Sequence, residues 1–164
     1  MNVLLVYPRG PETFWSFRHV LKFVSKKAAF PPLGLLTVAA LLPQQWNFKL
    51  VDLNVAELSD EVLHWADYVL LSGMIVHRKS AHEVAARCVQ HEKTVIAGGP
   101  LFTTGFREFP EIRHFVLGEA EDVIGNLRPT WSKERCKRSI VGAVGPTYAR
   151  LRYRVGTSFG YTIT

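Results

Sequence analysis

The stretch Val3-Leu4-Leu5-Val6-Tyr7, followed by Pro8-Arg9-Gly10-Pro11, decides the fold class of this chain. Five consecutive aliphatic or aromatic residues predict a β-strand that is buried on both faces. The two prolines and the glycine after it predict that the strand ends abruptly in a loop. A strand covered on both faces is typical of a parallel sheet that lies between two layers of helices.

Four similar apolar runs follow, and helical patterns separate them. The predicted strands are residues 48–53, 68–71, 94–97 and 114–117, and the predicted helices are residues 31–42, 59–65, 79–91 and a short one near 106–109. This alternation predicts an α/β fold, a doubly wound, flavodoxin-like or Rossmann-like five-stranded parallel sheet with helices on both faces. The longest apolar stretch, residues 31–43, is too short to form a transmembrane segment.

The charged residues are distributed unevenly along the chain. The 164 residues carry 20 Lys and Arg against 14 Asp and Glu, a net charge of +6. Residues 1–124 hold 12 of the basic and 13 of the acidic residues, so the basic excess lies entirely in residues 125–164. The residues after Ile124 also lose the regular helical and strand periodicity. We therefore predict a domain over residues 1–124 and a basic, poorly ordered tail over residues 125–164.

Several function classes lack their sequence signals. The two cysteines, Cys88 and Cys136, are too few for a disulfide framework and are not spaced like zinc or iron–sulfur ligands. Together with an N-terminus that does not resemble a signal peptide, they lead us to expect a cytoplasmic protein. The first strand is not followed by G-x-G-x-x-G, and the chain contains no G-x-x-x-x-G-K-[ST], so NAD and P-loop nucleotides are disfavoured.

Glycines directly follow three of the predicted strands, in Ser72-Gly73-Met74, Gly98-Gly99-Pro100 and Gly118-Glu119. Ligands of doubly wound sheets lie outside the carboxyl ends of the strands, where a glycine lets the backbone approach a bulky ligand. A single glycine here could simply make a tight turn, but three at the same end of one sheet indicate a binding site.

Four polar residues near these strand ends are further candidates. Asp52, Glu119 and Glu121 could accept hydrogen bonds from a ligand, although a solvated loop carboxylate is the common alternative. His77 could touch a ligand, but a lone histidine in this position is more often an exposed loop residue. The sequence contains no catalytic or metal-ligating constellation, such as H-E-x-x-H.

Eight short blocks, in a fixed order over residues 1–124, carry a family likeness. They are residues 3–8, Phe14-Trp15-Ser16-Phe17, residues 30–43, Val51-Asp52-Leu53-Asn54, Trp65-Ala66-Asp67-Tyr68, Ser72-Gly73-Met74-Ile75-Val76, Ala97-Gly98-Gly99-Pro100 and Gly118-Glu119-Ala120-Glu121. Together they resemble the N-terminal cobalamin-binding domain of cobalamin-dependent radical S-adenosylmethionine enzymes, most closely the hopanoid C-2 methylase branch.

The resemblance implies a corrinoid cofactor, cobalamin, held across the carboxyl ends of the strands. The residues that it implies for cofactor binding are Pro8, Pro31, Leu33, Gly34, Ser72, Gly73, Met74, Gly98, Gly99, Pro100, Gly118 and Glu119. It also implies methyl transfer from methylcobalamin to a substrate radical that a separate barrel domain generates. This domain would bind and orient the cofactor, whose cobalt carries out the difficult chemistry.

The chain departs from the family pattern in two places. D-x-H-x-x-G is absent, so cobalamin is expected to bind without a histidine ligand from that motif, while His77 leaves an axial role for an imidazole open. Cys-x3-Cys-x2-Cys is absent too, so an iron–sulfur cluster and S-adenosylmethionine would require a separate radical S-adenosylmethionine domain. With the charge change near Ile124, this indicates a truncated or frame-shifted reading frame without catalysis of its own, which sequencing of the locus tests.

Two alternatives stay open beside this cobalamin-binding module. The fold alone also suits a flavodoxin-like nucleotide or flavin binder. The basic tail, in which Arg150, Arg152 and Arg154 alternate with Tyr148 and Tyr153, could contact nucleic acid, which is the weaker alternative.

Overall fold

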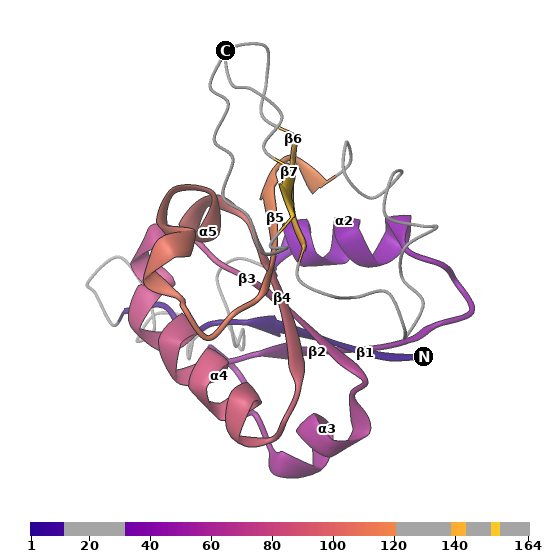
Figure 1. The fold of residues 1–164 in the computed structure, drawn as a ribbon. Coiled ribbons are helices and arrows are strands. Elements are labelled where there is room, and N and C mark those ends of the chain that lie inside the picture. Colours follow the sequence, from indigo (N-terminus) through magenta and orange to yellow (C-terminus); the bar gives the residue numbers. More distant parts are fainter. Residues whose placement is uncertain (12–31, 121–138, 144–151, 155–164) are drawn as a thin grey trace, which may run out of the picture.

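One seven-stranded sheet organises the chain. The computed structural model describes residues 1–11, 32–120, 139–143 and 152–154. The strands are β1 (Asn2–Tyr7), β2 (Asn47–Asp52), β3 (Tyr68–Ser72), β4 (Thr94–Gly98), β5 (His114–Gly118), β6 (Ser139–Ala143) and β7 (Arg152–Arg154). They lie in the order β2-β1-β3-β4-β5-β6-β7 (Figure 1). The predicted doubly wound sheet is confirmed, because β1 to β5 are parallel neighbours in the flavodoxin-like order 2-1-3-4-5.

The two additional strands come from the range that the sequence assigns to the basic tail. β6 overlaps residues 140–144, a short apolar piece of that range, and pairs in parallel with β5, from Phe115 opposite Ile140 to Gly118 opposite Ala143. β7 pairs antiparallel with β6 at the edge of the sheet. The predicted boundary near Ile124 lies outside the described residues, so the division into a domain and a tail stays a prediction.

The helices are α2 (Leu33–Leu41), α3 (Asp60–Trp65), α4 (Arg78–Gln90) and α5 (Pro100–Gly105), with 3₁₀ turns η2 (Ile75–His77) and η3 (Phe106–Glu108). Three of them lie where the sequence predicts them. The short helix expected near residues 106–109 is present as η3, but the sequence missed α5, which begins at Pro100 and directly precedes it. The pair Gly99-Pro100 suggests a turn in the sequence, but a proline is well tolerated in the first turn of a helix.

Helices cover both faces of the sheet, as the sequence predicts. α2 lies on one face, and α3, α4 and α5 lie on the other (Figure 1). β1 shows the reason for this in its side chains, because Leu4 and Val6 pack in the cluster on the α3–α5 face while Val3 and Leu5 pack on the α2 face. No helix within the described ranges is long and apolar enough to cross a membrane.

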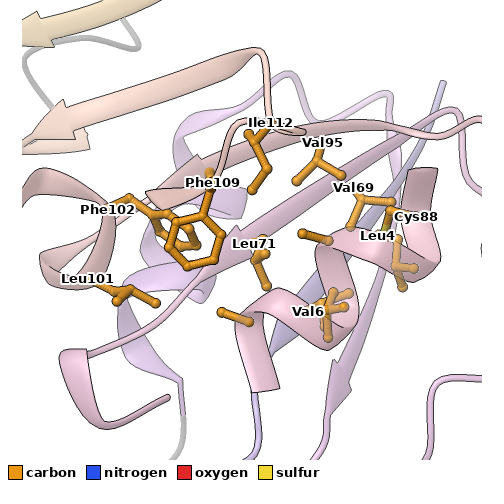
Figure 2. Packing of buried hydrophobic residues seen from close by; sticks show 14 of the residues in the cluster. Leu4, Val6, Val69, Leu71, Cys88, Val95, Leu101, Phe102, Phe109 and Ile112 are labelled. Carbon is orange, nitrogen blue, oxygen red and sulfur yellow. The ribbon is translucent and has the colours of Figure 1, made fainter. Parts of the chain in front are cut away.

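The larger core cluster fills the α3–α5 face. Phe102 and Phe109 are in contact within it, with ring centroids 4.8 Å apart. Figure 2 shows these two rings side by side and Cys88 of α4 at the far side of the cluster. Burial raises the pKa of the Cys88 thiol to about 11. A thiol that stays protonated is a poor nucleophile and metal ligand, so Cys88 is a core residue without chemistry.

Candidate functional site

A cleft of about 540 Å³ opens at the carboxyl ends of β3, β4 and β5, on the face of the sheet that α2 covers. A volume of this size is typical of small-molecule sites, which commonly lie at this end of a doubly wound sheet. The cleft is lined by Gly34, Leu35, Thr37, Val38, Leu70, Leu71, Ser72, Ile75, Ile96, Ala97, Gly98, Gly99, Pro100, Thr103, Thr104, Val116, Gly118, Glu119 and Ala120. α2 therefore forms one wall, and the loop after β4 with α5 forms the other.

The floor of the cleft consists of alternate residues of three neighbouring strands. Leu70 pairs with Ile96 in the strand register, and Gly98 pairs with both Ser72 and Val116. Residues paired in a parallel ladder point to the same face of the sheet, and so do residues i and i+2 of one strand. The floor is therefore apolar at Leu70, Ile96 and Val116. At the strand ends it is polar at Ser72 and has no side chain at Gly98.

Two glycines let backbone segments meet closely at the end of β4. Gly99 has φ 89° and ψ −179°, a conformation that is essentially restricted to glycine. A Cβ on Gly99 would lie 2.6 Å from Ser72 Oγ, and a Cβ on Gly98 would lie 3.2 Å from the carbonyl oxygen of Val116. The Leu101 N–H donates to the Gly73 carbonyl at 3.0 Å, so the turns after β3 and β4 are also bonded to each other.

The structure brings seven of the twelve predicted cofactor residues together around the cleft. These seven are Gly34, Ser72, Gly98, Gly99, Pro100, Gly118 and Glu119. Leu33 and Met74 lie outside the lining and are 65% and 50% exposed. Pro31 lies outside the described residues.

Pro8 and Gly73 also stay out of the cleft lining, for a different reason. Pro8 is fully buried, and a Cβ on Gly73 would lie 3.3 Å from His77 Nδ1 and 3.5 Å from Pro8 Cγ. Gly73 thus lies against the imidazole of His77, and Pro8 lies beside Gly73. The close contact explains the glycine at position 73 without any ligand.

His77 is buried, with 4% of its surface exposed, so the expectation of an exposed loop residue is wrong. Its Nδ1 accepts a hydrogen bond from the Met74 N–H at 3.1 Å. Its ring packs edge-to-face with the Tyr7 ring, and the two ring centroids are 4.9 Å apart. Burial lowers the pKa of the imidazole, although nearby Asp52 partly opposes this. The ring does not line the cleft and instead fixes η2.

The acidic candidates also differ in whether they line the cleft. Asp52 Oδ1 accepts from the backbone N–H of Asn54 at 2.9 Å and from its Nδ2 at 2.7 Å, so it fixes the turn after β2. Glu121 lies outside the described residues, and Asp52 does not line the cleft. Glu119 does, directly after the positive φ of Gly118 (86°), and it is the one acidic side chain in the described lining.

We predict that the buried imidazole makes folding depend on pH. Because the pKa of His77 is lower in the folded chain than its ordinary value of 6.5, the unfolded chain takes up protons first as the pH falls. Stability is therefore retained above pH 6.5 and lost as the pH falls below it; His114, whose pKa burial also lowers, contributes with the same sign. Urea unfolding at pH 7.5 and 5.5 measures the loss.

The matched variant is His77→Asn, whose Oδ1 can accept from the Met74 N–H without titrating. We expect this variant to lose less stability than the original chain between the two pH values, with the His114 contribution remaining. An equal loss in both proteins would show that His77 is not responsible.

The sequence reading missed the residues that give the cleft its shape. Leu70, Ile96 and Val116 form the floor, and Thr103 and Thr104 project from α5. The period-2 alternation within the apolar strands would have assigned the floor residues to one face. It could not have distinguished a cleft floor from ordinary core, and the threonines could not be placed while α5 was not predicted.

Together, the doubly wound sheet and a partly apolar cleft at its carboxyl ends define an α/β domain that binds a small molecule. Residues 23–128 match the family described as the B12 binding domain. The match spans more than half of the chain, so the chain belongs to the B12-binding domain family, and the cobalamin-binding resemblance is confirmed.

Two curated proteins are similar to the chain. An uncharacterized methyltransferase of Synechocystis sp. is 47% identical over 104 residues, which cover 63% of this chain and 19% of that protein. The hopanoid C-2 methylase of Rhodopseudomonas palustris is 32% identical over 143 residues, which cover 85% of this chain and 27% of that protein. The chain thus spans less than a third of either relative, and no solved structure matches it.

Proposed function

We propose that the cleft at the ends of β3, β4 and β5 holds cobalamin. The observation that carries this proposal is an apolar floor beneath backbone turns that have no side chains, at Gly98, Gly99 and Gly118. A flat aromatic base suits such a floor, and the bare turns leave room for a phosphate and sugar. The cleft holds about 540 Å³, and Gly98, Gly99 and Gly118 would be the residues that face the nucleotide part of cobalamin.

The polar residues of the rim suit the amide and hydroxyl groups of such a cofactor. Ser72, Thr103 and Thr104 offer hydroxyls, and Glu119 offers a carboxylate that accepts hydrogen bonds from amides. Gly34 leaves the α2 wall open, because a Cβ there would meet no atom within 4 Å. Five predicted cofactor residues would then contact parts of the cofactor outside the cleft or have no role in binding. They are Pro8, Pro31, Leu33, Gly73 and Met74.

We further propose that the domain binds cobalamin without a histidine ligand to the cobalt. Among the described residues that line the cleft, none is histidine, cysteine or methionine. His77 already accepts a hydrogen bond from Met74 through Nδ1 and lies outside the lining, which argues against an axial role. Bound cobalamin would supply a transferable methyl group, and the chain's residues would bind and orient it.

The proposed setting is methyl transfer in the cytoplasm, together with a separate radical S-adenosylmethionine domain. That domain would supply the iron–sulfur cluster and S-adenosylmethionine, since this chain lacks Cys-x3-Cys-x2-Cys. The printed names of the two relatives, a methyltransferase and a methylase, support this setting. Division into a cobalamin-binding domain over residues 1–124 and a basic tail over residues 125–164 belongs to the same proposal.

Retention of hydroxocobalamin tests the proposed function. We expect the purified chain, incubated with a small excess and then desalted, to keep about one corrinoid per chain, as measured by its visible absorbance. FMN treated in the same way is the control for the flavin alternative, and a short DNA duplex at low and high salt tests the basic tail. Loss of all corrinoid on desalting, or retention of FMN instead, would contradict the proposal.

A further inference from the structure

We propose that Thr103 is a positioning residue that fixes the geometry of the cleft by joining the turns after β4 and β5; this rests on the proposed function. Its hydroxyl donates to the carbonyl oxygen of Gly99 at 3.1 Å. The hydroxyl oxygen of Thr103 in turn accepts from the backbone N–H of Gly118 at 3.2 Å. One side chain therefore bridges the ends of two neighbouring strands, at the place where both contribute to the cleft.

A single hydroxyl can satisfy both partners at once, because it has one hydrogen to donate and two lone pairs to accept with. Its partners are unusual residues. Gly99 and Gly118 are the two glycines with positive φ in the part of the chain that the structure describes, at 89° and 86°. The Gly99 carbonyl also accepts from the backbone N–H groups of Phe102 and Thr103, so the Thr103 hydroxyl adds the link from this turn to Gly118. Thr103 therefore joins the two backbone turns of the site whose conformations favour glycine.

The hydroxyl of the neighbouring Thr104 makes a hydrogen bond of a different kind from that of Thr103. Thr104 donates to the Pro100 carbonyl at 3.1 Å, within its own helix. That bond connects α5 to itself and leaves the turn after β5 untouched. Among the described residues, only Thr103 connects α5 to Gly118 through a side-chain hydrogen bond.

The consequence concerns binding more than folding. Gly99 passes close over Ser72, and Glu119 follows Gly118, so a shift between the two turns moves both polar sides of the cleft. Without the hydroxyl, the Gly118 N–H also loses its hydrogen bond to α5. A ligand would then have to order the two turns as it binds, which lowers its affinity.

The test compares Thr103→Val, which keeps the shape, with Thr103→Ser, which keeps the hydroxyl. We expect the Val variant to bind hydroxocobalamin about tenfold more weakly, or about 1.4 kcal/mol, and the Ser variant to stay within about threefold of the original chain. Ser80→Ala is the control: it removes a hydroxyl that accepts from the Arg9 N–H on the opposite side of the sheet, and binding should be unchanged. Urea unfolding confirms that each variant folds.

Amide hydrogen exchange at Gly118 gives a readout that does not require cobalamin. It should be faster in Thr103→Val only, and unchanged exchange would overturn the bridging role. Unchanged affinity in the Val variant, or an equal loss in the Ser variant, would overturn the role in binding. Failure of the original chain to bind cobalamin would refute the proposed function, and the exchange experiment would then decide the role of Thr103 alone.

Discussion

Gly34→Phe is expected to abolish measurable cobalamin binding while the chain stays folded. Gly34 lies on the α2 wall of the cleft, and a Cβ at this position would meet no atom within 4 Å. A larger side chain can therefore extend into open space without displacing a neighbour. Phe also has a better helix propensity than Gly, by about 0.3–0.5 kcal/mol. The ring would occupy the volume that the ligand needs, so we expect at least about a hundredfold loss of affinity, or about 2.7 kcal/mol.

The control for this experiment is Leu36→Phe, on the same helix. Leu36 is 42% exposed and does not line the cleft, so its replacement adds a similar ring without entering the site. Titration with hydroxocobalamin, with urea unfolding in parallel, separates blocked binding from lost folding. If Gly34→Phe bound cobalamin as tightly as the original chain, the ligand would have to lie elsewhere.

The sheet could be predicted from the sequence because each strand carries its own burial signal. Val3 to Val6 are apolar without interruption, since β1 has a core on each face. All five predicted strands agree with the structure to within one residue at either end. β6 could not be recognised in the same way, because one short apolar run without a following helical pattern does not indicate its place beside β5.

Prediction of the site was less complete, and the reason is physical. Glycines after the strands could be recognised, because their position at the carboxyl ends follows from the fold class. The direction in which a loop residue points does not follow from the fold class. Pro8 and Gly73 directly follow strands, yet neither lines the cleft. Pro8 is fully buried beside Gly73, and Gly73 lies against His77. Such contacts depend on tertiary packing that no local pattern reports.

Gly99→Ala is expected to destabilise the fold by about 2–4 kcal/mol and to weaken cobalamin binding. The backbone of Gly99, at φ 89° and ψ −179°, lies in a region where a residue with a Cβ is strained by about 1–3 kcal/mol. The added methyl group would also lie 2.6 Å from Ser72 Oγ, which is closer than real contacts allow. Either a rotation of the Ser72 side chain or a movement of the turn after β4 away from β3 relieves this contact, and both changes alter the polar end of the cleft.

Combining this change with Ser72→Ala separates the two causes. Removal of the Ser72 hydroxyl eliminates the close contact, so Gly99→Ala should cost less in the Ser72→Ala background than in the original chain, and the remaining cost is backbone strain. Gly34→Ala is the glycine control, because this position is helical and open, and it should be neutral or stabilising by up to about 1 kcal/mol. Urea unfolding of the four Ser72 and Gly99 combinations gives the coupling free energy. A cost below about 1 kcal/mol for Gly99→Ala alone would mean that the turn adapts freely and does not hold the cleft in shape.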